Sequence, residues 1–334
     1  MKIIIDAMSG DKAPEEIVKG AVMARRELGV DVVLVGQQEV VKACLEAESC
    51  TDIEVVDARD VITMEDDPST ATRRKKDASM TVALNMLRDG SGDAVVSAGS
   101  TGALLTGATL IVKRINGIRR AALAPVLPNG GKGVVLIDSG ANVDCTPEYL
   151  LQFAYMGSFY ARTMLGLENP RVGLANVGTE DTKGGVLQHE TFQLLKAAGE
   201  AGRINFIGNV EGNGVFSGDV DVLVADGFTG NLMLKTAESI IKFMMGNLKS
   251  VFYKNLKNKL AAAVLKGDLA QMKKMLDVKE VGGTVMLGIS RPVIKAHGSS
   301  DARCILAAVR QAVTCVNSGI TEEIKANIEY MKIG

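Results

Sequence analysis

The feature that most constrains the fold is a repeated alternation of short, Val- and Ile-rich segments with longer segments of helical spacing. Strand–helix alternation of this kind predicts an α/β fold built on a doubly wound, mostly parallel sheet. Abundant glycine and scarce aromatic residues suit Val-rich parallel strands joined by tight turns. The predicted strands lie at 2–6, 31–36, 53–58, 93–99, 132–138, 171–176, 204–208 and 219–226.

The last third of the chain departs from this alternation. Residues 232–276 are almost wholly helical by their apolar spacing, and they hold many lysines with few acidic residues. After them we expect two short strands within 282–300 and a closing helix that Gly319 can cap. No internal repeat or low-complexity linker divides the chain. We therefore expect a single α/β domain over 1–334, from which an amphipathic helical hairpin projects at 242–280.

Charge and cysteine content exclude several functional classes. A formal net charge of −1 argues against bulk binding of nucleic acid. The five cysteines have no paired spacing, which indicates reduced thiols rather than a disulfide framework. No apolar run approaches the ~20 residues that a membrane-spanning helix needs. These observations predict a soluble, cytoplasmic protein with no nucleic-acid partner.

The segment VVSAGSTGALLTGATL, at 95–110, places a loop of small residues between a strand and a helix. Backbone N–H groups at a helix start have no intrahelical partner, and the helix dipole favours negative charge there. The layout therefore predicts a cradle for an anion. A tight strand-to-helix connection explains the loop equally well. The phosphate-binding residues that the first reading predicts are Ser97, Gly99, Ser100, Thr101 and Gly102.

The exits of the predicted strands share a polar, glycine-rich composition that the strand starts lack. Ligands bind beyond the carboxyl ends of the strands in an open parallel sheet. Gly, Asn and Asp are also ordinary turn residues, but six such exits together favour a functional cleft along one edge. The cleft residues predicted in this way are Asp6, Asp11, Asp138, Asn142, Asn176, Glu211 and Asp226.

Several well-defined active-site motifs are absent from the sequence. It has no clustered zinc ligands, no Gly-x4-Gly-Lys-Ser/Thr phosphate loop, no Gly-x-Gly-x-x-Gly after the first strand and no Gly-x-Ser-x-Gly elbow. We interpret His189 as structural, whereas His297 precedes a helix start and favours a site role. Together with Lys183, the small polar residues indicate positioning and charge stabilisation rather than covalent catalysis.

Eight motifs then identify a relationship. In chain order they are DAMSGDKAPEEIVKGA, RRKKDASM, VVSAGSTGALL, LIDSGANVDCTPEYLLQFAYMGS, NVGTEDTKG, FIGNVEGN, VADGFTGNLMLK and HGSS. Together they resemble the bacterial phosphate acyltransferases of the PlsX family, over nearly the whole chain. Three positions depart from the usual family pattern. Ser9 stands where glycine is usual, Ser100 where asparagine is usual and Ala78 where serine is usual.

The resemblance implies an enzyme that moves a long-chain acyl group from acyl carrier protein to inorganic phosphate. The acyl phosphate product would feed a membrane glycerol-3-phosphate acyltransferase and hence phospholipid synthesis. The implied fold is the α/β type shared with phosphate acetyltransferases and isocitrate-dehydrogenase-like enzymes, as a homodimer. No metal, nucleotide or other cofactor is needed, because phosphate itself is a competent nucleophile.

On this reading, phosphate attacks the acyl thioester directly, without an acyl-enzyme. The loop 97–102 and the helix start at Ser299 and Ser300 would cradle phosphate. Lys183 and His297 would supply positive charge or hydrogen bonds to phosphate and to the developing oxyanion. Asn231 would orient the thioester carbonyl. The thiolate leaving group is stable enough, with a pKa near ~8.5 as for free cysteine, to need no strong general acid.

The basic segments predict partners. RRKK at 73–76, Lys113-Arg114 and Arg119-Arg120 are candidate docking charges for an acidic acyl carrier protein, although solvated charge explains such clusters equally well. In the hairpin, an apolar stripe runs between lysines. The stripe predicts either a dimer interface or peripheral contact with an anionic membrane. Its residues are Leu248, Val251, Phe252, Leu256, Leu260 and Val264.

Three other functions fit parts of the sequence. A short-chain phosphate acetyltransferase using acetyl-coenzyme A would share the phosphate chemistry but need no acyl channel. An NAD-dependent dehydrogenase would share the fold but needs a metal-binding aspartate cluster that we do not find. A non-catalytic scaffold that binds acyl carrier protein at a membrane would leave the strand exits unconstrained, and their crowded polar edge argues against it.

Overall fold

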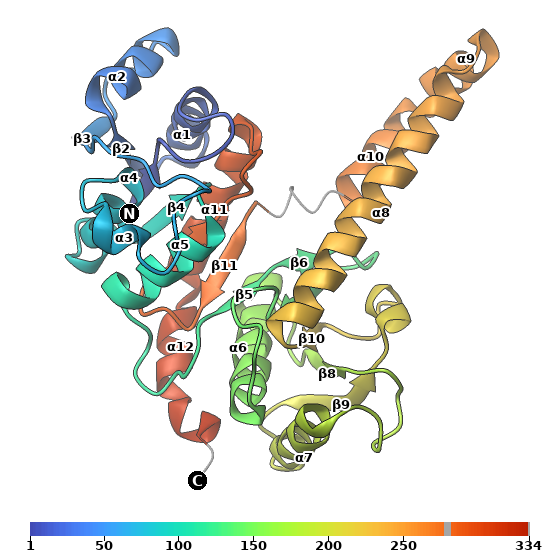
Figure 1. Cartoon of the computed structure of the whole chain (residues 1–334). Coiled ribbons are helices and arrows are strands. Elements are labelled where there is room, and N and C mark those ends of the chain that lie inside the picture. The colour runs from blue at the N-terminus through green and yellow to red at the C-terminus, as the bar shows by residue number, and fades with distance from the viewer. Residues whose placement is uncertain (277–281, 333–334) are drawn as a thin grey trace.

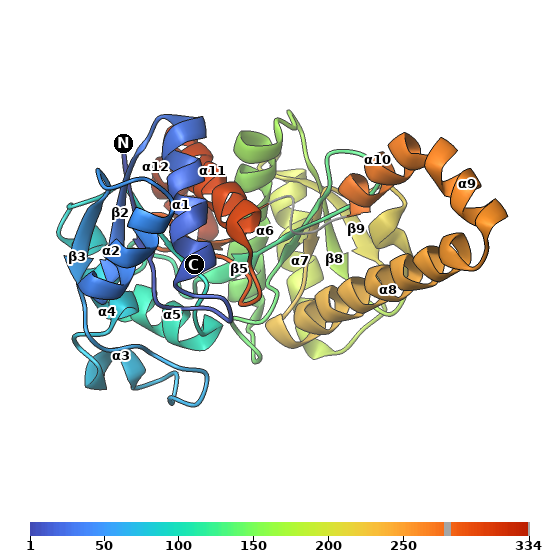
Figure 2. The ribbon, with the colours of Figure 1, turned by 90° about the horizontal axis from the view of Figure 1, so that it is seen from above.

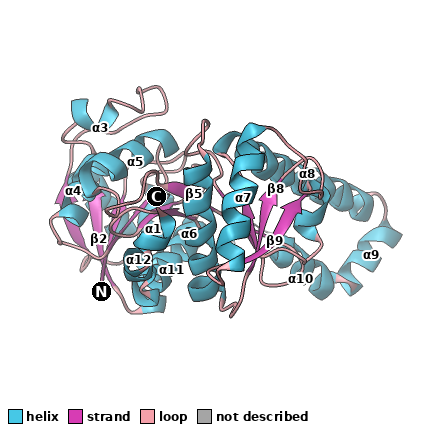
Figure 3. Ribbon diagram, turned by 90° about the horizontal axis from the view of Figure 1, so that it is seen from below, coloured by secondary structure: helices cyan, strands magenta, loops and turns pink. Residues whose placement is uncertain are grey.

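The computed structural model describes residues 1–276 and 282–332 (Figure 1). Strands alternate with helices as predicted, and the chain forms an α/β fold with mostly parallel pairing. The strands divide between two sheets, a division that the sequence pattern did not reveal. Helices lie against the strands of both sheets (Figure 3).

Seven described strands form the first sheet, in the order β3-β2-β1-β4-β12-β11-β5. Neighbouring strands from β3 to β12 are parallel, whereas β11 runs antiparallel to both its neighbours. The pairing of β4 with β12 brings the predicted loop after residue 97 beside the segment that precedes His297. The strands are β1 (Lys2–Asp6), β2 (Asp31–Gly36), β3 (Glu54–Asp57), β4 (Ala94–Ser97), β5 (Ala122–Ala124), β11 (Thr284–Leu287) and β12 (Val293–Lys295).

Five described strands form the second sheet, in the order β6-β7-β10-β8-β9, with only β6 antiparallel to its neighbour. They are β6 (Val126–Leu127), β7 (Val134–Ile137), β8 (Arg171–Ala175), β9 (Asn205–Val210) and β10 (Val222–Val224). The sequence pattern does not predict β5 or β6, because both strands are short and Pro125 separates them. This segment carries the chain from one sheet to the other.

The helices predicted from apolar spacing are present, and additional short ones join them. Pro14 immediately precedes the first helix, where its missing N–H costs no intrahelical bond. In chain order the helices before the last third are α1 (Glu15–Leu28), α2 (Gln38–Ala47), α3 (Ala71–Arg74), α4 (Ser79–Arg88), α5 (Thr101–Gly107), a π-helical turn (Ala108–Val112), α6 (Pro147–Leu165), α7 (Val186–Glu200) and a 3-10 turn (Gly212–Phe216).

One apolar core cluster contains side chains from both sheets, including Ile3 of β1, Ile137 of β7 and Val222 of β10. Helix α6 is buried continuously from Leu150 to Ala161, because it packs against the second sheet and against the C-terminal helices. Those helices are α11 (Ala302–Ser318), α12 (Ile320–Ala326) and a 3-10 turn (Ile328–Met331). Shared burial of this kind fixes the two sheets relative to each other.

Helices α8 (Gly227–Tyr253), α9 (Leu256–Val264) and α10 (Lys266–Leu276) extend away from the two sheets (Figures 1 and 2). We call residues 239–276 the helical arm, since the last buried residue of α8 is Ala237. The arm corresponds to the predicted hairpin at 242–280, of which 277–280 lie outside the described residues. Within the described ranges, length and hydropathy together qualify no single helix as a membrane span, and only the bent pair α11–α12 meets both criteria jointly.

Candidate active site

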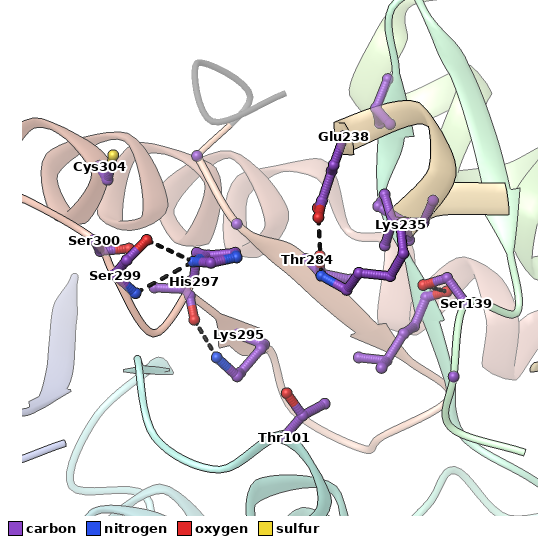
Figure 4. Close-up of a pocket in the computed structure, with 18 of the residues that line it drawn as sticks. Thr101, Ser139, Lys235, Glu238, Thr284, Lys295, His297, Ser299, Ser300 and Cys304 are labelled. Carbon is purple, nitrogen blue, oxygen red and sulfur yellow. Dashed lines mark hydrogen bonds and ion pairs between the residues drawn. The ribbon is translucent and has the colours of Figure 1, made fainter. Parts of the chain in front are cut away.

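A cavity of about 730 Å³ lies where the exits of β4 and β12 in the first sheet face the start of α8 and the exit of β7 in the second. The sequence predicted a cleft at the strand exits, and five of the predicted site residues line this cavity. They are Thr101, Asn231, His297, Ser299 and Ser300. Figure 4 shows several of them around the cavity.

The loop 97–102 contributes one side chain to the cavity wall, that of Thr101 at the start of α5. The Ser97 hydroxyl donates to Asp6 and accepts from the N–H of Gly99, and the Ser100 side chain caps α5 by accepting from Ala103 N–H. Ser97, Gly99, Ser100 and Gly102 do not line the cavity. These four residues instead shape the loop that presents Thr101.

Two glycines in this loop have steric reasons for being glycine. A Cβ at Gly99 would collide with Met80 and approach Ser9, and a Cβ at Gly102 would lie 2.8 Å from Pro68. The loop is therefore packed closely against its surroundings. The tight strand-to-helix connection is present, and it places Thr101, at the start of α5, in the cavity wall. The binding of an anion by this loop stays a prediction.

His297 and Ser299 form a local hydrogen-bonded unit beside the start of α11 (Figure 4). His297 Nδ1 accepts the backbone N–H of Ser299 at 3.2 Å and lies 3.0 Å from the Ser299 hydroxyl oxygen. Since Nδ1 accepts a hydrogen bond from a backbone N–H, it carries no proton in this geometry, and the ring proton of neutral His297 is on Nε2. The ring can therefore donate a hydrogen bond from Nε2.

The hydroxyl of Ser300 is buried at the cavity wall, and it has no hydrogen-bond partner among the described residues. Most buried polar groups are paired, so an unpaired hydroxyl in a cavity indicates a group that a ligand satisfies. The backbone N–H of Ser300 bonds to the carbonyl oxygen of His297, which holds the turn. This finding supports the predicted contact of Ser300 with phosphate.

Lys295, the last residue of β12, also lines the cavity, although it was not among the predicted site residues. Burial, together with the nearby charge of Lys235, lowers the pKa of Lys295 to about 8, against the opposing influence of Asp11 and Asp6. A lysine at the end of the apolar segment VIKAHG was the available signal. That signal is weak, because lysine often ends a strand at the protein surface.

The opposite wall of the cavity is largely apolar. Helix α8 presents Leu234, Ile241 and Met245 at helical spacing, and β5–β6 presents Leu123, Pro125 and Val126. Lys235 and Glu238 of the same helix form an ion pair at 2.9 Å (Figure 4). The cavity therefore has a cationic, hydroxyl-rich end at β4 and β12 and an apolar surface along β5–β6 and α8, which Lys235, Glu238 and Lys242 interrupt on α8.

The predicted residues Asp138, Asn142 and Asp226 support the wall without lining it. The Asp138 carboxylate accepts backbone N–H groups of Leu123, Ser139 and Asn142, and also the Asn142 side-chain amide at 3.1 Å. Burial raises the pKa of Asp138, and these hydrogen bonds oppose that rise. Asp226 caps α8 by accepting the Thr229 N–H at 2.8 Å. Together they fix Ser139, Gly140 and the first turn of α8.

Asp6 and Asp11 lie behind the cationic end rather than in it. Asp6 accepts hydrogen bonds from the hydroxyls of Ser79 and Ser97, each at 2.6 Å. The backbone N–H of Asp11 bonds to the carbonyl oxygen of Gly298 at 2.8 Å. Neither side chain lines the cavity, but both carboxylates interact electrostatically with Lys295.

Three predicted residues lie elsewhere. Lys183, Asn176 and Glu211 follow β8 and β9, which occupy the far side of the second sheet from β7. The Lys183 ammonium lies 3.6 Å from Glu180, and the Asn176 side chain donates to the carbonyl oxygen of Lys183 at 3.0 Å. None of the three lines the cavity. The sequence does not separate these residues from the other strand exits, because it does not reveal the order of the strands in the sheets.

No group of three His, Cys, Asp or Glu side chains is placed to hold a metal ion among the described residues.

Comparison with solved structures identifies the fold. Phosphotransacetylase from Streptococcus pyogenes superposes with a TM-score of 0.61 at 18% identity, covering 96% of this chain and 94% of that one. A structure described as a putative 4-hydroxythreonine-4-phosphate dehydrogenase from Salmonella typhimurium superposes with a TM-score of 0.54 at 14% identity, covering 94% and 98%. These structural similarities support the prediction that the protein shares its fold with phosphate acetyltransferases.

Comparison of sequences identifies the family. A family model described as "Fatty acid synthesis protein" matches residues 1–323. Phosphate acyltransferase from Oceanobacillus iheyensis is 45% identical over 330 residues, covering 98% of both chains. Phosphate acyltransferase from Anoxybacillus flavithermus is 46% identical, covering 99% of this chain and all of its own. The chain is therefore an acyltransferase that belongs to the phosphate acyltransferase family.

Proposed function

We propose that this protein transfers a long-chain acyl group from acyl carrier protein to inorganic phosphate, producing acyl phosphate for phospholipid synthesis. The observation that carries this proposal is the two-sided cavity. Its cationic, hydroxyl-rich end suits phosphate, and its apolar side along α8 suits an acyl chain. A cavity for acetyl groups alone would not need an apolar wall of this extent.

In the proposed reaction, the hydroxyls of Thr101, Ser299 and Ser300 hold the phosphate beside two helix starts. His297 Nε2 and the Asn231 amide donate hydrogen bonds to the thioester carbonyl oxygen as negative charge develops on it. The acyl chain lies against Leu234, Ile241 and Met245. The chain's own residues thus position both reactants and stabilise the oxyanion.

The test is mass-spectrometric detection of acyl phosphate after mixing the purified protein, palmitoyl-acyl carrier protein and inorganic phosphate. Acetyl-coenzyme A replaces the acyl donor in a parallel reaction. Long-chain acyl phosphate with release of the free carrier thiol supports the proposal. Acetyl phosphate alone would identify a short-chain enzyme, and no product from a correctly folded protein would favour a non-catalytic scaffold.

Among the predicted docking charges, those at the end of α3 are the best placed for acyl carrier protein. Arg73, Arg74 and Lys76 are exposed, whereas Lys75 is engaged with Asp66 at 2.9 Å. Helix α3 packs against α5, whose first residue lines the cavity. A carrier bound there would deliver its thioester to the cavity, while the 113–120 cluster lies around a separate hollow.

A charge reversal, Arg73→Glu with Arg74→Glu, tests this docking surface. The KM for palmitoyl-acyl carrier protein should rise about tenfold or more, because acidic partners depend on such charges for encounter. The KM for palmitoyl-coenzyme A should change much less. Lys113→Glu is the matched control in the other basic cluster, and an equal effect there would contradict the assignment to α3.

For the helical arm we propose a second copy of the chain as the partner of its base. Ile240, Phe243 and Met244 are more than half exposed on α8 and are accompanied by few unpaired charges, as an isologous interface requires. The lysines and the exposed Leu256, Leu260 and Val264 near the tip suit an anionic membrane surface. Peripheral contact there would bring the cytoplasmic enzyme to the membrane glycerol-3-phosphate acyltransferase.

Light scattering coupled to gel filtration tests the dimer, with Phe243→Glu expected to yield monomers. Sedimentation with vesicles of anionic phospholipid tests the tip, with Leu260→Glu expected to reduce binding. A wild-type protein that is monomeric yet binds vesicles through Phe243 would assign the base of the arm to the membrane instead.

A further inference from the structure

Lys295 lines the cavity, but the reaction proposed above gives it no role. It pairs in register with Ser97, so its side chain starts at the exits of the two central parallel strands, β4 and β12. The ammonium donates hydrogen bonds to the carbonyl oxygens of Ala296 and Ala98, the latter at 3.5 Å. An ammonium has three donors, so one N–H remains for a ligand in the cavity.

The charges around Lys295 neither neutralise it nor hold it in an ion pair. Among the described residues, no carboxylate lies within 4.0 Å of its ammonium nitrogen, although Asp6 of β1 and Asp11 of the following loop attract it. Lys235 of α8 repels it from the other side of the cavity, and His297 lies two residues along the chain. Phosphate in the cavity would be a dianionic partner for this ammonium.

We propose that Lys295 contacts the attacking phosphate and carries its proton to the thiolate leaving group. This inference rests on the proposed function. An unprotonated oxygen of hydrogen phosphate attacks the thioester carbon, a C–O bond forms, and the C–S bond breaks with the electron pair on sulfur. The ammonium gives its proton to the thiolate, and the resulting amine takes the remaining proton of the acyl phosphate. The products are the acyl phosphate dianion and a free thiol.

The proton affinities of the groups agree with this step. The pKa of Lys295, about 8, lies close to the ~8.5 of a free thiol, so proton transfer between them is nearly balanced in free energy. His297 is less suited, because Ser299 occupies its Nδ1 and its Nε2 already carries the proton. It can donate a hydrogen bond but cannot accept the phosphate proton without breaking that arrangement.

The experiment compares Lys295→Arg and Lys295→Met with the wild-type enzyme. Arginine keeps the positive charge but does not release a proton, so the KM for phosphate should stay within a few-fold while kcat falls about 100-fold or more. Methionine removes both the positive charge and the transferable proton, so the affinity for phosphate should fall as well as kcat. Isothermal titration with inorganic phosphate, which needs no turnover, measures the contact separately, and thermal unfolding confirms that each variant folds.

The pH dependence of kcat/KM for phosphate provides a second readout, because this ratio reports the ionisation of the ligand-free enzyme. Since the active form is the ammonium, wild-type kcat/KM should fall as the pH rises through about 8. The arginine variant should lack this decline. Lys235→Met removes the repulsion that helps to lower the pKa of Lys295, so its decline should shift to higher pH.

The outcomes of these experiments distinguish the proposed function of the protein from the proposed role of Lys295. A wild-type protein that makes no acyl phosphate would overturn the proposed function. An active wild-type enzyme with an equally active arginine variant would overturn proton transfer by Lys295. Phosphate binding that is unchanged in Lys295→Met would overturn the contact itself.

Discussion

The hydroxyl of Ser97 donates a hydrogen bond to Asp6 Oδ2 at 2.6 Å, and both residues are buried. Their strands, β1 and β4, are paired neighbours, so two strand exits that the sequence predicted as ligand contacts hold each other instead. The other carboxylate oxygen of Asp6 accepts from Ser79. The bonds fix the start of the loop that presents Thr101 to the cavity.

We predict that Asp6→Ala destabilises the protein by about 1–3 kcal/mol. The substitution leaves the buried hydroxyls of Ser79 and Ser97 without their acceptor, and each unsatisfied buried group costs a desolvation penalty. Urea denaturation measures the change. Asp11→Ala is the control, because that residue is exposed, and a change within about 0.5 kcal/mol is expected. Equal effects would show that the Asp6 hydrogen bonds contribute nothing.

For Ser300→Ala we expect the opposite pattern, a kinetic defect with unchanged stability. The Ser300 hydroxyl has no partner among the described residues, so its removal leaves no group unsatisfied. The KM for phosphate should rise roughly tenfold or more, the effect of losing a hydrogen bond to a charged ligand. Steady-state kinetics and urea denaturation of the same sample measure both quantities. Loss of stability with a normal KM would assign Ser300 to the fold alone.

Ile241→Trp should shift the acyl preference towards shorter chains. The larger side chain fills part of the apolar side of the cavity, so palmitoyl transfer should fall by about tenfold or more relative to octanoyl transfer. Competition between the two acyl-carrier donors measures the ratio directly. Ser239→Trp lies on the exposed face of the same helix and should leave the ratio unchanged. An unchanged ratio in both variants would show that the acyl chain does not lie against α8.

Two glycines of α8 should respond oppositely to alanine. A Cβ at Gly230 would collide with the backbone carbonyl oxygen of Asp138, so Gly230→Ala should displace the first turn of α8 and reduce activity and stability. A Cβ at Gly246 meets nothing within 4 Å, so Gly246→Ala should stabilise the helix by up to about 1 kcal/mol. Thermal unfolding of both variants measures these changes in stability. A destabilised Gly246→Ala would show that Gly246 is not exposed on the helical arm.

Native thiol labelling should spare two cysteines. Burial raises the pKa of the Cys145 and Cys315 thiols to about 12 each, so both stay protonated at neutral and mildly alkaline pH. Only the thiolate reacts with disulfide reagents. Labelling followed by peptide mass spectrometry should find both unmodified until denaturant is added. Rapid native modification of the half-buried Cys145 would show that the pKa of its thiol is not raised in this way.

The sequence alone determined much of this protein's architecture. Apolar periodicity located most strands and helices, because a strand buries alternate or continuous apolar residues and a helix buries every third or fourth. The polar composition of the strand exits indicated one functional edge, and Thr101, Asn231, His297, Ser299 and Ser300 do line one cavity. Eight motifs in order identified the family.

Only the tertiary structure decided which exits meet. Strand order places the exits of β4, β12 and β7 around the cavity and leaves Lys183 and Glu211 beyond it. The role of Lys295 depends on its pairing with Ser97 and on charges from Asp6, Asp11 and Lys235. These contacts join residues far apart in the chain, and local sequence carries no record of them because register, burial and charge proximity arise only when the sheets assemble.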